Sequence, residues 1–214
     1  MLESYFTIKG DGEHEIVIQK SRFIGHVKRT ETEEEAQAFI QAIKKKHYQA
    51  THNCSAYMIG ENNLIQKAND DGEPSGTAGV PMLDVLQKMD LKDTCVVVTR
   101  YFGGIKLGAG GLIRAYSSST SEAIKHVGVV KRLLMKEVVV QANYSLLGKV
   151  ENELRNNQHV IDKIDYADDV TFHVYVPIAD TEDFQTWMTD LTNAQVKLSL
   201  GNERHMEIDV DLND

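Results

Sequence analysis

The first half of the chain alternates short β-like runs with amphipathic helical stretches. A helix is predicted after Thr32, a favourable N-cap residue, because apolar residues recur behind it at helical spacing and three lysines close it. A second, short helix is predicted to open at Pro81. The continuous apolar run 94–99 is typical of a central strand, and a helix is predicted to follow it as far as about residue 126. The other runs read as strands: 5–8, 15–19, 23–27, 54–59 and 65–68.

The second half begins the same kind of pattern again near residue 132. Residues 170–176 alternate apolar and polar side chains, which predicts a strand with one face in water. The predicted order is strand 137–142, helix 145–156, strands 160–166 and 170–176, helix 181–193, and a last strand at 196–200 and 207–212. This βαββαβ order is that of a ferredoxin-like domain. The sequence therefore predicts an α+β protein with two domains, residues 1–130 and 131–214.

Net charge differs sharply between the two predicted domains. The chain of 214 residues has a formal net charge of −9, of which residues 1–130 contribute −1 (15 basic, 16 acidic) and residues 131–214 contribute −8 (8 basic, 16 acidic). An anionic ligand would be repelled by the second domain and tolerated only by the first. Broad, sequence-independent DNA binding is not expected, because it needs a basic surface that this chain lacks overall.

Composition and cysteine usage are typical of a globular cytoplasmic protein. Hydrophobic residues make up 42% of the chain, yet no apolar run reaches the length of a membrane span, so no membrane partner is expected. The N-terminal residues lack the basic start and apolar core of a signal peptide. Cys54 and Cys95 lie in apolar runs and are predicted to be buried free thiols.

A glycine-rich loop with basic residues around it, residues 99–117, follows the predicted central strand and leads into a helix. Its charges are Arg100, Lys106 and Arg114, and its glycines include Gly103, Gly104, Gly108 and Gly110. A strand, a glycine loop and a helix N-terminus together favour an anion site, because free N–H groups and the helix dipole point the same way. Neither the P-loop spelling nor the dinucleotide fingerprint is complete. The alternative is a tight structural connection in which glycines allow close packing.

A second unusual loop, residues 70–83, carries the acidic residues Asp70, Asp71 and Glu73. These carboxylates could hold an Mg²⁺ ion that is bridged to a phosphate on the glycine loop. The EF-hand spacing is absent and acidic turns are mostly solvated, so no metal is predicted. His47, His52 and Cys54 lie close together in sequence without the further ligands of a zinc site. Motifs for an activated nucleophile are incomplete, so neither catalytic residues nor a cofactor are predicted.

Two segments resemble the IMPACT family in its bacterial two-domain form. They are DDGEPSGTAG at residues 70–79 and the stretch from Gly79 to Gly108, which contains RYFGG and a characteristic apolar spacing. The resemblance implies a two-layer N-terminal domain like a small-subunit ribosomal protein domain and domain IV of elongation factor G. It also implies a ferredoxin-like C-terminal domain. Eukaryotic relatives regulate translation by competing for a scaffold that activates a starvation-sensing kinase. Bacteria lack that pathway, so only a translation-linked binding module carries over.

We therefore expect a non-enzymatic cytoplasmic regulatory module that contacts RNA, the ribosome or a translation-related protein. The two loops are expected to face each other across one cleft, with Tyr101 and Phe102 stacking on a ligand or packing in the core. The predicted ligand-binding residues are Arg100, Tyr101, Gly103, Gly104, Lys106, Gly108, Gly110, Arg114, Asp70, Asp71 and Glu73. One alternative is a nucleotide- or phosphate-binding enzyme that uses the same cleft. The other is a protein–protein adaptor whose docking face carries Asp209 and Asp211, with His173 and Tyr175 nearby.

Overall fold

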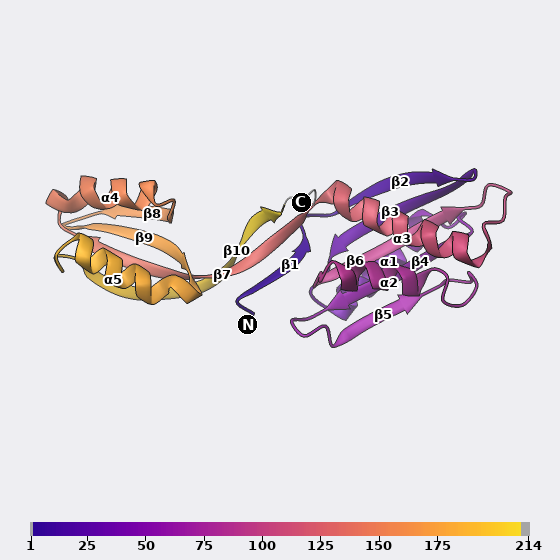
Figure 1. Ribbon diagram of the computed structural model, residues 1–214, viewed down its shortest axis with the longest axis horizontal. Coiled ribbons are helices and arrows are strands. Elements are labelled where there is room, and N and C mark those ends of the chain that lie inside the picture. Colours follow the sequence, from indigo (N-terminus) through magenta and orange to yellow (C-terminus); the bar gives the residue numbers. More distant parts are fainter. Residues whose placement is uncertain (1, 211–214) are drawn as a thin grey trace. The chain divides into compact units, whose positions relative to one another are not determined.

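The computed structural model describes residues 2–210, and within them the chain forms two compact units. Residues 5–132 and 208–210 belong to the first unit, and residues 2–4 and 133–207 belong to the second. Figure 1 labels the helices and strands of both units. Each unit has its own hydrophobic core, so each is described separately below.

The first unit is built on a five-stranded antiparallel sheet with the order β2-β3-β6-β4-β5. Its strands are β2 (Gly12–Ile18), β3 (Ser21–Arg29), β4 (His52–Ile59), β5 (Ile65–Asn69) and β6 (Thr94–Tyr101). As the apolar run predicted, β6 is the central strand, with β3 on one side and β4 on the other. A further strand, β1 (Ser4–Ile8), is the neighbour of β7 in the other sheet.

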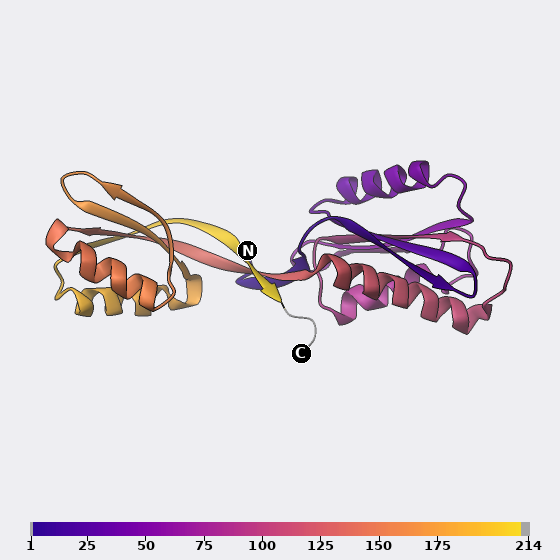
Figure 2. The ribbon, with the colours of Figure 1, turned by 90° about the horizontal axis from the view of Figure 1, so that it is seen from above.

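Helices cover both faces of this sheet. Helix α1 (Glu33–Lys46) packs on one face, whereas α2 (Gly79–Lys88) and α3 (Gly108–Val127) pack on the other. Figure 2 shows α1 (dark purple) on one side of the sheet and α3 (rose) on the other. The N-terminal domain therefore has three layers, helix–sheet–helix, where the family resemblance implied two.

Side-chain alternation along β6 explains the double covering. Val96 and Val98 pack into the core beneath α2 and α3, whereas Cys95 and Val97 pack beneath α1. Because successive side chains of a strand point to opposite faces, a strand with an uninterrupted apolar run must be covered on both sides. Helix α1 begins where the sequence predicted, since the Thr32 hydroxyl accepts a hydrogen bond from the Glu35 N–H.

The second unit has the predicted ferredoxin-like order. Its strands are β8 (Val160–Tyr166), β9 (Val170–Pro177) and the greater parts of β7 (Val129–Ala142) and β10 (Lys197–Val210), whose remaining residues belong to the first unit. Its helices are α4 (Leu147–Asn156) and α5 (Thr181–Leu191). The sheet runs β7-β9-β8, with β10 also paired to β7. Both helices pack on the same sheet face, and Figure 2 shows α4 (orange) and α5 (gold) on one side of it. The α+β class is thereby confirmed.

The last strand differs from the expectation in one respect. The sequence indicated two pieces, 196–200 and 207–212, separated by a polar stretch. The structure has one continuous strand, β10, across that stretch as far as Val210. Pairing to β7 provides hydrogen-bond partners for the polar segment as well. This pairing could not be predicted from local hydrophobicity, because it depends on a strand that is distant in sequence.

Candidate functional site

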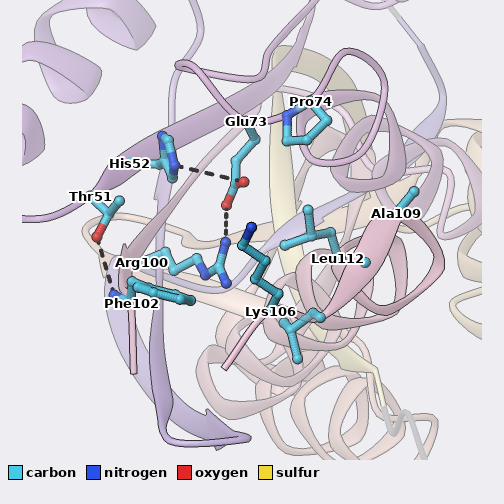
Figure 3. Close-up of a pocket in the computed structure, with 11 residues that line it drawn as sticks. Thr51, His52, Glu73, Pro74, Arg100, Phe102, Lys106, Ala109 and Leu112 are labelled. Atoms are coloured by element: carbon cyan, nitrogen blue, oxygen red, sulfur yellow. Dashed lines mark hydrogen bonds and ion pairs between the residues drawn. The ribbon is translucent and has the colours of Figure 1, made fainter. Parts of the chain in front are cut away.

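One pocket of the first unit brings together residues from the acidic loop and the glycine loop. Its volume is about 410 Å³. It lies on the α2/α3 side of the sheet, beyond the end of β6 and at the start of α3 (Figure 3). The lining residues are Thr51, His52, Glu73, Pro74, Arg100, Phe102, Lys106, Leu107, Gly108, Ala109 and Leu112. Four of the eleven predicted site residues are among them: Glu73, Arg100, Lys106 and Gly108.

Arg100 is held in the wall of this pocket by a buried ion pair. It pairs with Phe23 of β3 and His52 of β4 across the sheet, and only 5% of its surface is exposed. Its Nη1 donates to Glu73 Oε1 at 2.6 Å, and the Tyr116 hydroxyl donates to the same oxygen at 2.8 Å. Arg100 was expected to contact phosphate, but Glu73 already neutralises its charge.

The ion pair leaves some polar capacity unused. The buried Nε of Arg100 has no hydrogen-bond partner within residues 2–210. On the other side of the pair, His52 Nε2 lies 3.7 Å from Glu73 Oε2 (Figure 3). An unpaired buried donor costs about 1–3 kcal/mol, so Nε is a local source of instability beside the ion pair.

Lys106 supplies the unpaired positive charge of the pocket. Its side chain is exposed, and it makes no hydrogen bond or ion pair with the described residues. Helix α3 begins two residues later, and its N-cap residue Leu107 provides no side-chain acceptor for the first N–H groups. The first turn of α3 carries no acidic residue either. Free N–H groups, the helix dipole and Lys106 therefore favour an anion at the same place.

Two glycines of the loop leave space beside this helix end. A Cβ atom on Gly108 or Gly110 would meet no heavy atom within 4 Å. Gly108 also has a φ of +69°, which side-chain-bearing residues rarely adopt. Helix α3 begins at Gly108, two residues after Lys106, and both residues line the pocket. The conformation of Gly108 therefore helps to shape the edge of the pocket.

Gly103 and Gly104 have structural roles instead. A Cβ on Gly103 would come within 2.1 Å of the Lys20 backbone, so the missing side chain permits contact with the β2–β3 turn. Its N–H donates to the Ser21 hydroxyl at 3.1 Å. Gly104 has a φ of +88° in the turn that follows. For Gly103, the structure therefore supports the alternative interpretation, in which the glycine allows close packing.

The two aromatic residues at the end of β6 point in different directions, as strand alternation requires. Phe102 lines the pocket and is 47% exposed, and the Arg100 guanidinium carbon lies 5.4 Å from the centre of its ring. Tyr101 lies outside the pocket lining, and its hydroxyl is 2.9 Å from His47 Nδ1. The aromatic residue that lines the pocket is therefore Phe102, whereas Tyr101, also predicted for the site, lies outside this lining.

Asp70 and Asp71 lie outside the pocket lining and hold the acidic loop together. Asp70 accepts hydrogen bonds from the backbone N–H groups of Gly76, Ala78 and Gly79. Burial by itself would raise the pKa of Asp70, but these three donors outweigh it and hold the pKa below its usual value. Asp71 accepts from the Lys44 ammonium group and the Asn53 N–H, each at 2.6 Å. Both carboxylates therefore stabilise the conformation of the acidic loop.

The thiols are not poised for nucleophilic chemistry. Cys54 and Cys95 are buried and unpaired, as predicted. Burial raises the pKa of Cys54 to about 12 and also raises the pKa of Cys95, so both are protonated near neutral pH. Throughout residues 2–210, no group of three or more His, Cys, Asp or Glu side chains is placed to hold a metal ion.

The residues proposed for an acidic docking face are in contact with charged partners. Asp209 accepts from the Lys9 ammonium group at 2.8 Å, and the Arg204 guanidinium stacks 3.8 Å from the centre of the Tyr175 ring. His173 lies between two carboxylates, 2.7 Å from Glu137 and 3.0 Å from Asp165. Asp211 lies outside the described residues. The free acidic surface expected here is thus reduced by neighbouring cations.

Arg114 is exposed on α3, outside the lining of the pocket, and forms no hydrogen bond or ion pair with the residues that the structure describes. Sequence reasoning missed several lining residues, among them Thr51, His52 and Pro74. The sequence indicated His52 only as one of three neighbouring residues of an incomplete zinc site, together with His47 and Cys54. Its pairing opposite Arg100 across β4 and β6 could not be read from the sequence, because strand register is not local information.

Comparisons with known proteins cover most of the chain. The Impact N-terminal domain family matches residues 19–124, and a domain of unknown function (DUF1949) matches residues 140–195. IMPACT family member YvyE of Bacillus subtilis is 62% identical over 97% of this chain and 95% of its own length. IMPACT family member YigZ of Escherichia coli is 34% identical over 85% of this chain and 90% of its own length.

A solved structure agrees with these relatives. A crystal structure described as that of a hypothetical protein is 32% identical, with a TM-score of 0.60, and the alignment covers 92% of this chain and 97% of that one. Within residues 2–210 every helix is too short or too polar to cross a bilayer. Sequence and structure comparisons thus agree on the two-domain organisation.

Proposed function

The chain belongs to the IMPACT family, and we propose that it is a non-enzymatic regulatory module of translation that binds RNA through the pocket of its N-terminal domain. The observation that carries this proposal is the meeting of Lys106, the uncapped N-terminus of α3 and the exposed Phe102 around one pocket. These groups supply a cation, backbone donors and an aromatic face.

The pocket chemistry fits one nucleotide of a single strand. A phosphate at the α3 N-terminus would accept from its free N–H groups and pair with Lys106. A base beside it would stack on Phe102, which is the usual way that proteins hold unpaired bases. Glu73 does not repel the phosphate, because Arg100 and Tyr116 already engage its carboxylate. The volume of about 410 Å³ falls in the usual range for ligand pockets.

The distribution of charge supports contact through the N-terminal domain. Residues 1–130 have a net charge of −1, whereas residues 131–214 have a net charge of −8. A polyanion therefore meets far less repulsion at the first domain. With few unpaired cations at the pocket, binding should involve few phosphates and be modest in strength.

The proposal is tested with a fluorescently labelled single-stranded RNA and the full chain in an anisotropy titration. Lys106→Glu should weaken binding about tenfold or more, because a charged hydrogen bond contributes roughly 1.5–3 kcal/mol. The matched control is Lys45→Glu, which makes the same charge change at an exposed position on α1, across the sheet from the pocket. It should leave binding nearly unchanged.

Other outcomes would overturn the proposal in favour of the alternatives. Equal weakening by Lys106→Glu and Lys45→Glu would show that only net charge matters. Binding of free nucleotide with Mg²⁺, but not of RNA, would favour a nucleotide-binding enzyme. Absence of binding to either ligand would favour a protein–protein adaptor. A thermal unfolding measurement checks that outcome independently, because a ligand that binds only the native state raises Tm.

A further inference from the structure

The C-terminal domain contains a second pocket that the RNA proposal does not use. It has a volume of about 280 Å³ and lies where the end of β9, the start of α5 and the turn after α4 meet. Its lining residues are Asn157, His159, Val176, Pro177, Asp180, Asp183, Phe184 and Trp187. All of them belong to the second compact unit.

Three aromatic rings form a continuous wall of this pocket. The centre of the His159 ring lies 4.9 Å from that of Phe184 and 5.2 Å from that of Trp187, and the Phe184 and Trp187 centres are 5.6 Å apart. Phe184 is buried, whereas His159 and Trp187 are only half-buried. Ring surface of these two residues is therefore accessible to a ligand, and the face of an aromatic ring attracts cations.

The charges around the aromatic wall are all negative. Asp180 and Asp183 are exposed, and neither forms a hydrogen bond or ion pair with the side chains that the structure describes. The lining contains neither lysine nor arginine. Burial lowers the pKa of His159, so its ring is neutral near neutral pH and keeps a nitrogen that can accept a hydrogen bond.

Neither a helix-capping role nor core packing accounts for the whole arrangement. Asp183 lies in the first turn of α5, where its negative charge interacts favourably with the helix dipole, as does that of its neighbour Glu182. Asp180 makes no side-chain cap bond to α5. A helix dipole does not explain an open aromatic cavity beside these carboxylates, and a packed core would have filled it.

We propose that this pocket binds the cationic side chain of an arginine or lysine in a basic peptide segment of a protein partner. The aromatic wall would receive the cation, and Asp180 and Asp183 would pair with it. The volume lies at or below the lower end of the usual range for small-molecule pockets, roughly 300–1,000 Å³, which suits one long side chain. A basic peptide also complements the net charge of −8 of residues 131–214.

The test uses Trp187, the only tryptophan of the 214 residues, as its reporter. The full chain is titrated with a short peptide containing arginines, and then with the same peptide containing the neutral isostere citrulline. We expect a saturable change in tryptophan emission with the arginine peptide and at least tenfold weaker binding of the citrulline peptide. Calorimetric titration of the same peptides detects binding to which the fluorescence is insensitive.

Two double variants separate the pocket from general charge effects. Asp180→Asn with Asp183→Asn should weaken binding of the arginine peptide about tenfold. Glu182→Gln with Asp190→Asn removes the same charge from exposed positions of α5 outside the lining and should have little effect. Equal binding of both peptides, equal weakening by both double variants, or absence of binding in both assays would overturn the inference. The RNA-binding test is independent of all three results.

Discussion

At the scale of single residues, the ion pair Arg100–Glu73 connects the two segments that carry the family resemblance. Arg100 belongs to RYFGG and Glu73 to DDGEPSGTAG, and their side chains meet at 2.6 Å with both residues buried. The motifs therefore support each other structurally at the pocket wall. A buried guanidinium needs its carboxylate, because an uncompensated charge in an apolar environment is costly.

Glu73→Gln is expected to destabilise the protein by about 3–5 kcal/mol, because it leaves the Arg100 charge buried without its counter-charge. The control is Glu122→Gln, which breaks an exposed ion pair with Lys125 on α3. Exposed pairs contribute about 0–1 kcal/mol, so the control should lose little stability. Urea unfolding of the two variants and the parent chain provides the comparison. Losses of equal size would contradict the structural role given to the pair.

At the scale of elements, the two helices that border the loops begin differently. The loop before α2 folds back so that Asp70 accepts from the N–H groups of Ala78 and Gly79. The loop before α3 provides no such acceptor, and Lys106 stands near that end instead. One helix N-terminus is satisfied by the chain itself, whereas the other is open to an anion.

Asp70→Asn tests the closed N-terminus. An amide oxygen replaces a carboxylate that accepts three backbone hydrogen bonds, so a loss of about 1–3 kcal/mol is expected at pH 7. The native pKa of Asp70 is depressed, so its contribution is complete above the unfolded pKa and disappears as pH falls through the native value.

The difference in stability between Asp70→Asn and the parent chain should therefore shrink in acid, as thermal unfolding at pH 7 and pH 3 would show. Asp84→Asn, at an exposed position of α2 itself, is the matched control and should change stability little at either pH. A difference for Asp70→Asn that stays constant between the two pH values would show that the charge of the carboxylate does not contribute.

Much of the fold could be predicted from element patterns, whereas the site could be predicted only in part. Periodicity gave the βαββαβ order, and the run 94–99 gave the central strand, because both signals are local. Register is not local, so the pairing of His52 with Arg100 was not foreseen. The ion pair of Arg100 with Glu73 was not foreseen either, because the sequence gives the charge of Arg100 but not the burial of its partner.

At the scale of the whole molecule, the chain combines two chemically different domains. The N-terminal domain is nearly neutral, with a pocket suited to an anion, and the C-terminal domain is strongly acidic, with a pocket suited to a cation. Under the two proposals made above, the N-terminal pocket would engage an RNA phosphate and the C-terminal pocket a basic protein segment, each through complementary charge.

The most direct test of the central claim is the salt dependence of RNA binding by the parent chain and by Lys106→Glu. Binding through phosphate contacts must weaken as salt rises, and loss of one contact should reduce the log–log slope by about 0.7 for single-stranded RNA. We predict that Lys106→Glu shows this reduction and that Lys45→Glu keeps the parent slope. Binding that does not fall with added salt, or the same slope for Lys106→Glu and the parent chain, would contradict phosphate recognition at this pocket.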